Sequence, residues 1–161
     1  MSKILLLFFL IAIIIVCFLV AKDFMNINVL IGDGFSQRAN IVLKSSDSSN
    51  LSRIFSQDCI EEDIISYDDT YSNYIIRTFI QDIDVDFKLV MPWSKTTIMR
   101  TSEVIENIDG EIPSALIDED TEDVAKTPPA WDNGYYDVTL TRFESTWRIT
   151  DIDKIESMDE Q

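Results

Sequence analysis

An apolar run near the start of the chain limits what its first part can form. The run begins at Ile4, ends at Ala21 and reads ILLLFFLIAIIIVCFLVA, with no charged residue, glycine or proline. As a helix rising about 1.5 Å per residue it would be about 27 Å long, close to the roughly 30 Å hydrocarbon thickness of a bilayer. We therefore expect a transmembrane helix, with residues 1–22 as a membrane anchor.

The flanks of this run favour an uncleaved signal anchor over a cleaved signal peptide. The apolar core of a signal peptide has about 7–15 residues and ends at a small-x-small cleavage site. A site ending at Ala21 would need a small residue where Leu19 stands, and a lipoprotein site at Cys17 would need glycine or alanine where Val16 stands. Cleavage remains the alternative and would leave a secreted domain.

The charge of the remaining chain predicts which side of the membrane it occupies. Lys3 and Lys22 flank the run equally, but the part after Lys22 holds all 29 acidic residues and 11 basic ones, a net charge of −18. Cytoplasmic segments next to a membrane span carry an excess of Lys and Arg instead. We expect a domain outside the cytoplasm. Its charge excludes nucleic acid as a partner and favours a basic protein or a divalent cation.

The pattern after the anchor changes from helical to strand-like. Residues 23–50 are interpreted as a juxtamembrane segment and linker that includes GDGF and KSSDSSN. Apolar residues then recur three or four apart from Leu51 to Ile65, which predicts an amphipathic helix with Ser49 or Asn50 as its N-cap. The domain is expected to span residues 51–156, followed by a tail at 157–161.

Four strands are expected beyond this helix. Residues 74–91 alternate between apolar and polar, with Phe79, Ile83, Val85, Phe87 and Leu89 on the buried face, and residues 95–108 form the partner strand. Residues 135–143 and 146–154 form a second hairpin around Glu144 and Ser145. A short helix is possible at 114–124 within the acidic connection. Strands following a helix predict an α+β fold with an antiparallel sheet on one or more helices.

Few residues are candidates for chemistry. The chain has no histidine, which excludes His-dependent nucleophilic catalysis and zinc sites that need histidine. Cys17 and Cys59 are the two cysteines, and only Cys59 lies outside the apolar run. The DIDVDF motif (Asp82, Asp84, Asp86) lacks the glycine and the glutamate of a calcium loop, so a solvated strand face is the better interpretation.

Metal binding has one set of weak candidates, and no catalytic or cofactor-binding residue is identified. The acidic block DEDTED could gather oxygen ligands, although such blocks are usually solvated segments or interaction surfaces. Trp93, Trp131 and Trp147 are assigned to the core or its rim. The weak metal candidates are Asp118, Glu119, Asp120, Glu122 and Asp123.

The last 110 or so residues resemble the NTF2-like, or cystatin-like cone, superfamily in its membrane-anchored or secreted bacterial branch. The carriers are LSRIFSQDCI, the hairpin YIIRTFIQDIDVDFKLVMPWSKTTIMRTSEVIENI and the ending YYDVTLTRFESTWRITDI. The resemblance implies a curved sheet around a helix with a cone-shaped pocket. One helix before the sheet, where fuller members have three, implies a shallow or closed cone, and no catalytic set transfers.

Two functions are therefore expected, in order of preference. The first is a non-enzymatic, membrane-tethered extracytoplasmic module that binds or assembles with a protein, as an accessory subunit of a cell-envelope or secretion complex would. The second is a small-ligand-binding or enzymatic cone, or an acidic immunity-type partner of a basic protein. The apolar residues assigned to the inner strand face favour the first.

Overall fold

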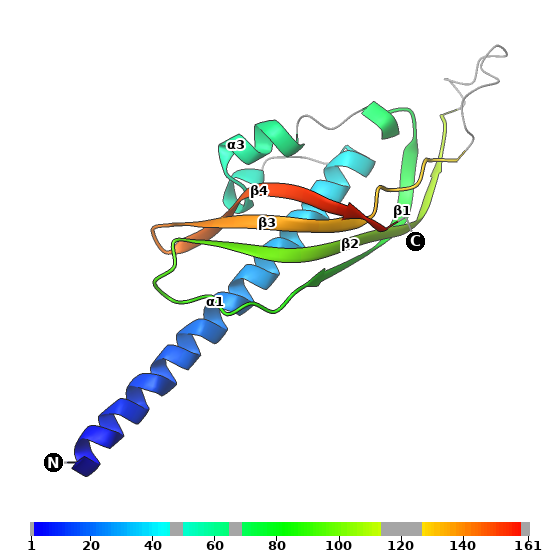
Figure 1. Cartoon of the computed structure of the whole chain (residues 1–161). Helices are drawn as coiled ribbons and strands as arrows, with labels where there is room; N and C mark the ends of the chain where they lie inside the picture. Colours follow the sequence, from blue (N-terminus) through cyan, green and yellow to red (C-terminus); the bar gives the residue numbers. More distant parts are fainter. Residues whose placement is uncertain (1, 46–49, 65–68, 114–126, 159–161) are drawn as a thin grey trace.

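The protein is an α+β structure with a long N-terminal helix and a four-stranded antiparallel sheet (Figure 1). The computed structural model describes residues 2–45, 50–64, 69–113 and 127–158. The elements are α1 (Ser2–Lys44), α2 (Leu51–Ile54), α3 (Gln57–Cys59), η1 (Ile60–Ile64), η2 (Asp69–Tyr71), β1 (Ile75–Val85), β2 (Thr96–Glu111), β3 (Gly134–Phe143) and β4 (Thr146–Ser157). The α+β class and the antiparallel sheet predicted from the sequence are confirmed.

Helix α1 is one continuous helix of 43 residues with two different halves. Its N-terminal half projects away from the sheet (Figure 1), and its apolar side chains are exposed. By length and composition this half suffices to cross a membrane. The C-terminal half passes along the sheet and buries Ile27, Ile31, Phe35, Ala39 and Leu43, a helical spacing of four.

The extent of α1 differs from the expected juxtamembrane segment. Residues 23–44 continue the helix through the GDGF motif, and their buried face fills the core. Two glycines cost a helix roughly 2 kcal/mol in propensity relative to alanine. Burial of the large apolar side chains around them contributes about 1.5–3 kcal/mol each and outweighs that cost. Tertiary packing therefore keeps residues 23–44 helical, although the glycines would favour a break in the helix there.

The amphipathic helix expected from Leu51 onwards is interrupted. Phe55 is extended between α2 and α3, with φ −106° and ψ 155°. Phe55 forms a parallel bridge with Ile149, and the Ser56 N–H donates to the Ile149 carbonyl at 2.8 Å. Pairing with the edge of β4 thus replaces one turn of helix. Asn50 occupies the N-cap position of α2 but makes no side-chain capping bond, whereas the Ser56 hydroxyl caps α3.

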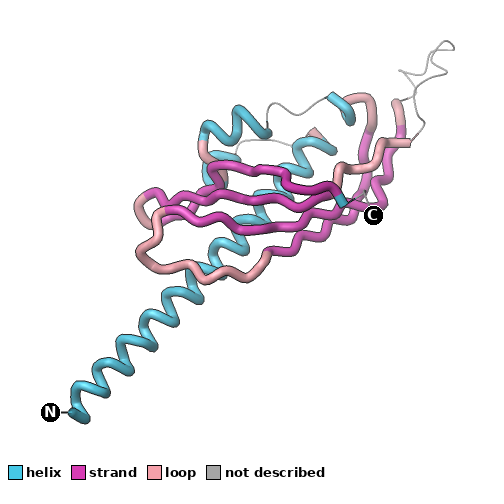
Figure 2. Tube along the Cα trace, viewed as in Figure 1, coloured by secondary structure: helices cyan, strands magenta, loops and turns pink. Residues whose placement is uncertain are grey.

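The four strands follow one another in the sheet in chain order. β1 pairs with β2, β2 with β3 and β3 with β4, so each connection joins neighbouring strands. The expected final hairpin is confirmed, with Glu144 at φ 57° in its turn. In the view of Figure 2, α1 passes behind the sheet and no described helix lies in front. One face of the sheet is therefore covered and the other is open, and we call the open side the outer face.

Strand β1 is shorter than predicted, which changes two assignments. It ends at Val85, and Phe87 and Leu89 are 74% and 54% exposed instead of buried. The last ladder contact on this side is the Asp86 N–H donating to the Arg100 carbonyl at 2.9 Å. After Asp86 the chain is no longer paired with β2. The alternation of the strand therefore no longer determines which side chains are buried. Val90 enters the core instead, at 2% exposure.

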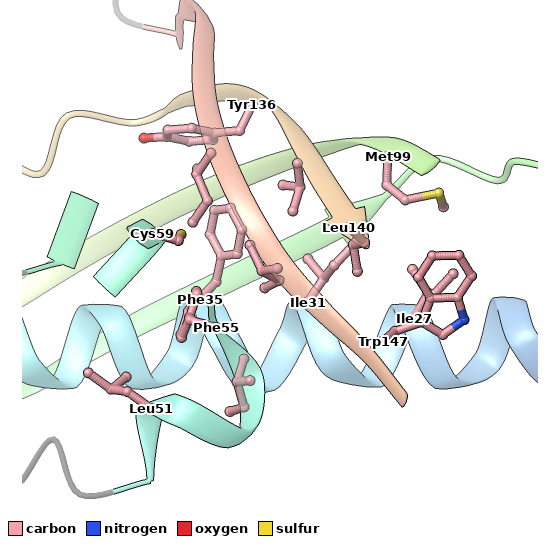
Figure 3. Close-up of a cluster of buried hydrophobic side chains, with 14 of the residues drawn as sticks. Ile27, Ile31, Phe35, Leu51, Phe55, Cys59, Met99, Tyr136, Leu140 and Trp147 are labelled. Atoms are coloured by element: carbon pink, nitrogen blue, oxygen red, sulfur yellow. The ribbon is translucent and has the colours of Figure 1, made fainter. Parts of the chain in front are cut away.

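The core lies between α1 and the covered face of the sheet (Figure 3). In Figure 3, Phe35 of α1 lies beside Phe55, Ile31 lies near Leu140 of β3, and Trp147 of β4 lies beside Ile27. Trp147 and Ile149 are buried in this cluster, as the sequence predicts. A second cluster at the far end joins Ala39 and Leu43 to Tyr71, Ile76, Ile105 and Trp131.

Candidate functional site

A buried ion pair occupies the centre of the covered face. Arg38 of α1 donates from Nη1 to Oε2 of Glu103 on β2 at 3.0 Å, and the two residues are 5% and 0% exposed. Gln81 Nε2 donates to the other carboxylate oxygen at 2.7 Å, and Trp131 Nε1 donates to Oε2 at 3.3 Å. Both oxygens of Glu103 are therefore satisfied by donors from three separate elements or loops.

Burial and the neighbouring groups have opposite effects on the pKa of Glu103. Loss of water raises the pKa of the Glu103 carboxyl above its ordinary value, while Arg38, Gln81 and Trp131 oppose that rise. The Arg38 guanidinium also lies near three aromatic rings, 5.6 Å from the centre of Phe35, 5.3 Å from Tyr136 and 5.9 Å from Trp131. Cation–π contacts with these rings partly replace the hydration that the buried guanidinium has lost.

A cavity of about 400 Å³ lies beside this pair, with Arg38 at its wall. Tyr71, Trp131 and Tyr136 supply aromatic surface, and Lys154 forms an ion pair with Asp132 at the rim. Burial raises the pKa of Tyr71, with a smaller contribution from Asp132, and burial likewise raises the pKa of Tyr136. Both phenols are therefore neutral at physiological pH, and the cavity combines aromatic walls with balanced charges.

The chemical groups of this centre are directed mainly at one another. Glu103 does not line the cavity, and Asp132, which does, is held by Lys154. Tyr71 donates to the Ala130 carbonyl at 3.1 Å, and Tyr136 donates to the Asp132 carbonyl at 3.3 Å. This arrangement ties α1, β2 and the segment before β3 together, and it leaves the cavity suited to binding rather than proton transfer.

The outer face of the sheet carries a second arrangement, made of carboxylates in register. Asp137 on β3 pairs with Arg100 on one side, at 3.5 Å, and lies directly opposite Asp153 of β4 on the other. Like charges directly opposite each other in an antiparallel pair are destabilising. The acidic residues at outer-face positions are Asp82, Asp84, Glu106, Asp137, Asp151, Asp153 and Glu156.

Large apolar side chains lie between these acidic residues on the outer face. Ile80 of β1, Ile98 of β2 and Tyr135 of β3 are each more than two-fifths exposed. Tyr135 lies opposite Ser102 on one side and Glu156 on the other, so it stands among short and acidic neighbours. Exposed aromatic and aliphatic residues within a charged surround are typical of protein-binding surfaces.

The structure separates the residues that the sequence singled out. Asp82 and Asp84 are exposed on β1, as predicted for a solvated strand face, and Asp86 follows the strand. Trp131 and Trp147 are buried, whereas Trp93 is 72% exposed in the loop between β1 and β2. Among the described residues no cluster of three or more potential ligands could hold a metal ion. Asp118, Glu119, Asp120, Glu122 and Asp123, and the helix expected at 114–124, lie outside the described residues.

Sequence reasoning missed the buried Arg38–Glu103 pair, although a signal was present. Strand β2 alternates from Thr97 to Ile105, and Glu103 stands on the same parity as Met99 and Ile105. Arg38 follows Phe35 by three residues and Ile31 by seven on one helix face. A charged residue at each of these buried positions predicts an internal pair once both elements are known to face each other.

Comparison with protein-family models, curated proteins and solved structures finds no match for this chain. Kinship with the NTF2-like superfamily therefore stays a prediction, and no relative's activity informs the function.

Proposed function

We propose that this protein is a non-enzymatic, single-pass membrane protein whose extracytoplasmic α+β domain binds or assembles with a protein partner. An accessory subunit of a cell-envelope or secretion complex has this plan. The observation that carries the proposal is the outer face of the sheet, where carboxylates in register surround exposed apolar side chains. Asp137 and Asp153 are directly opposed there, at a cost to stability that a basic partner would relieve.

The continuity of α1 supports this proposal. The same helix contains the apolar run and the buried residues Ile27, Ile31 and Phe35, without a linker between them. A helix with a buried, packed half cannot pivot freely relative to the sheet. The outer face is therefore held in a set orientation relative to the proposed membrane span, which suits a subunit that meets a partner in the same membrane.

Charge supports a basic partner. The part of the chain after Lys22 has a net charge of −18, and the outer face contributes seven of its acidic residues. A surface of one sign accelerates association with a partner of the other sign, and this effect weakens as salt is added. The apolar groups Ile80, Ile98 and Tyr135 supply area that can be desolvated at the centre of such a contact.

Site-specific photocrosslinking of the full chain in its native membrane tests the proposal. A photoreactive phenylalanine analogue at Tyr135 should give one reproducible adduct with another polypeptide. The same analogue at exposed Glu62 in η1, away from the sheet, serves as the matched control and should give none. Asp137→Asn together with Asp153→Asn should weaken the adduct at Tyr135 at least about threefold. Absence of any protein adduct at Tyr135 would contradict the proposal.

The cavity beside Arg38 favours a second candidate function, the binding of a small molecule. Its volume of about 400 Å³ and its aromatic walls suit a compact aromatic ligand. Native mass spectrometry of the full chain released from membranes tests this candidate. A bound molecule lost on Ala130→Trp, which would fill the cavity, and retained on Glu62→Trp would support it. A mass equal to that of the chain alone would oppose it.

A further inference from the structure

The loop between β1 and β2, residues 86–95, lies where α1 leaves the domain (Figure 1). It exposes large apolar side chains. Phe87, Leu89 and Trp93 are 74%, 54% and 72% exposed. The outward direction of these three contrasts with Val90, which is 2% exposed and belongs to the core. The loop is therefore amphipathic, with one residue anchored in the core and three whose side chains are largely exposed.

Specific contacts hold this loop against α1. The rings of Phe87 and Phe24 meet edge to face with centres 4.9 Å apart. Arg142 of β3 donates to Oδ2 of Asp23 at 2.7 Å and also to the carbonyl of Pro92. One guanidinium thus links the helix to the loop. The position of the loop along α1 follows from these contacts.

An apolar groove separates the loop from the helix and extends along the apolar run. The groove has a volume of about 400 Å³, and its walls include Val16, Val20 and Ala21 of α1 and Phe87, Leu89 and Met91 of the loop. Val16, Val20 and Ala21 belong to residues 4–21, the proposed membrane span. If these three residues lie in the hydrocarbon layer, Phe87, Leu89 and Met91 on the opposite wall of the groove lie close to that layer.

The helical rise gives the depth of the loop. Phe24 lies three residues beyond Ala21, about 4.5 Å along the axis. The polar layer of a bilayer adds roughly 5–7 Å on each side of the hydrocarbon, so Phe24 and the Phe87 ring against it fall within that layer. Aromatic side chains are enriched at this level because their rings are amphipathic. Lys22 follows Ala21 on α1 and is exposed, and a long lysine side chain can reach the headgroups from this level.

We propose that residues 86–95 form a second membrane contact, in which Phe87, Leu89 and Trp93 enter the interfacial layer of the leaflet that α1 leaves, and lipid acyl chains occupy the groove. This inference rests on the proposed membrane span of α1. It goes beyond the proposed function because it assigns the loop to the lipid and leaves the outer face of the sheet for the protein partner. The domain then meets the bilayer at two points, α1 and the loop.

Tryptophan quenching by brominated lipid tests the proposal on the full chain. The protein is reconstituted in phosphatidylcholine vesicles whose acyl chains carry bromine near the headgroups. Trp131 and Trp147 are each 5% exposed within the domain, so subtracting the signal of Trp93→Phe isolates Trp93. We expect bromine to lower the Trp93 emission at least about twofold. The matched control is Tyr135→Trp in the Trp93→Phe background, which places a tryptophan on the outer face and should be quenched little.

Two outcomes overturn the proposal, and carbonate extraction of the same vesicles distinguishes them. If the chain resists extraction but Trp93 is quenched no more than the control, the loop does not contact lipid, and water or a protein covers it. If the chain is extracted, the membrane span fails and the loop contact fails with it. The proposal stands only if the chain is retained and Trp93 is selectively quenched.

Thiol accessibility gives a second measurement that does not depend on fluorescence. Cys17 lies in the proposed span and Cys59 is buried, so the background reaction with a membrane-impermeant maleimide should be small. In vesicles, Leu89→Cys should react at least about tenfold more slowly than Ile80→Cys on the outer face, because lipid covers only the loop. Equal rates would contradict the lipid contact.

Discussion

The Arg38–Glu103 pair has lost nearly all contact with water, and its energetic role depends on how completely its polar groups are satisfied. Arg38, Gln81 and Trp131 together supply donors to both carboxylate oxygens of Glu103. Removing one member of a buried pair leaves the other charge uncompensated, whereas replacing both by apolar groups is often neutral. The pair is therefore better understood as a device that aligns α1 with β2 than as a net source of stability.

A double-mutant cycle checks this role. Arg38→Met alone should lower the free energy of unfolding by about 3–5 kcal/mol, because Glu103 then stays buried without its cation. Arg38→Met combined with Glu103→Leu should recover most of that loss. Chemical denaturation of the full chain in detergent micelles measures both. A double variant as unstable as the sum of the single variants would show that the two residues act independently.

The titration of Glu103 gives a pH dependence of definite sign. Burial raises its pKa in the folded protein, so the folded state binds the proton more tightly than the unfolded state does. The contribution of Glu103 to stability is then complete below its ordinary pKa of about 4.5 and falls as pH rises through the raised value. We expect the stability of the wild type relative to Glu103→Gln to decrease from pH 4 upwards. An increase over that range would mean that Arg38 outweighs burial.

At the scale of elements, the two glycines of α1 stand in contrasting surroundings. A Cβ at Gly34 would lie 2.8 Å from Cδ1 of Ile149 and 3.2 Å from atoms of Ile54 and Phe55, whereas a Cβ at Gly32 meets nothing within 4 Å. Gly34 thus allows the helix to approach β4 and α2 closely. Gly32 has no such role and simply costs helix propensity.

This contrast makes a matched prediction. Gly32→Ala should raise the free energy of unfolding by about 0.5–1 kcal/mol, since alanine favours the helix and has room. Gly34→Ala should lack this gain, and Gly34→Val should destabilise by about 1–3 kcal/mol through overpacking. Denaturant unfolding of the three variants in micelles decides the matter. A gain at Gly34 equal to that at Gly32 would show that α1 does not depend on this close approach.

The opposed carboxylates of β3 and β4 link stability to the proposed partner. Asp153→Asn should raise the free energy of unfolding by about 0.2–1 kcal/mol, because Asp137 loses a like charge directly opposite. The same variant should weaken photocrosslinking at Tyr135. Asp82→Asn is the control, since Asp82 lies opposite Val104 and gains no such relief. A loss of stability in Asp153→Asn would mean that Asp153 makes a favourable contact in the free domain.

For the whole molecule, the decisive feature is that one helix serves both the proposed span and the core. The arrangement brings residues 86–95 to the level of Ala21 and Phe24, and with the proposed span in a bilayer it would give the sheet a set height and direction over that bilayer. A domain on a flexible tether would lack both properties. Under the two proposals, the outer face and the loop have separate partners, one a protein and one the lipid.

Uncoupling the two halves of α1 tests this arrangement. Insertion of Gly-Ser-Gly-Ser between Ala21 and Lys22 leaves residues 23–44 and their core contacts unchanged, so the midpoint of unfolding should stay within about 3 °C. Quenching of Trp93 by brominated lipid should fall at least about twofold because the loop is no longer held at the surface. Insertion of four alanines, which preserves the helix, is the control for added length. Unchanged quenching in the Gly-Ser variant would show that the loop binds lipid without help from α1.

Local patterns in the sequence accounted for much of the architecture. The alternation in residues 74–91, the Thr-, Val- and Ile-rich run at 95–108 and the tight turn at Glu144 and Ser145 predicted strands that the structure contains, although β1 ends at Val85. Phe87, Leu89 and the glycines of α1 were misassigned because periodicity and propensity describe one element at a time. Whether a strand continues, or a glycine breaks a helix, depends on the hydrogen bonds and packing contacts that the neighbouring element supplies.

By itself, the sequence determined the features that arise from runs of similar residues: the apolar segment at 4–21, the acidic remainder, the strand hairpins and the absence of histidine. These depend on composition and short periods, which need no partner element. Only the tertiary structure decided that α1 runs unbroken into the core, that Arg38 meets Glu103, and that Phe87 lies against Phe24 where the helix leaves the domain. The Arg38–Glu103 and Phe24–Phe87 contacts join residues more than 60 positions apart, and no local pattern contains their energies.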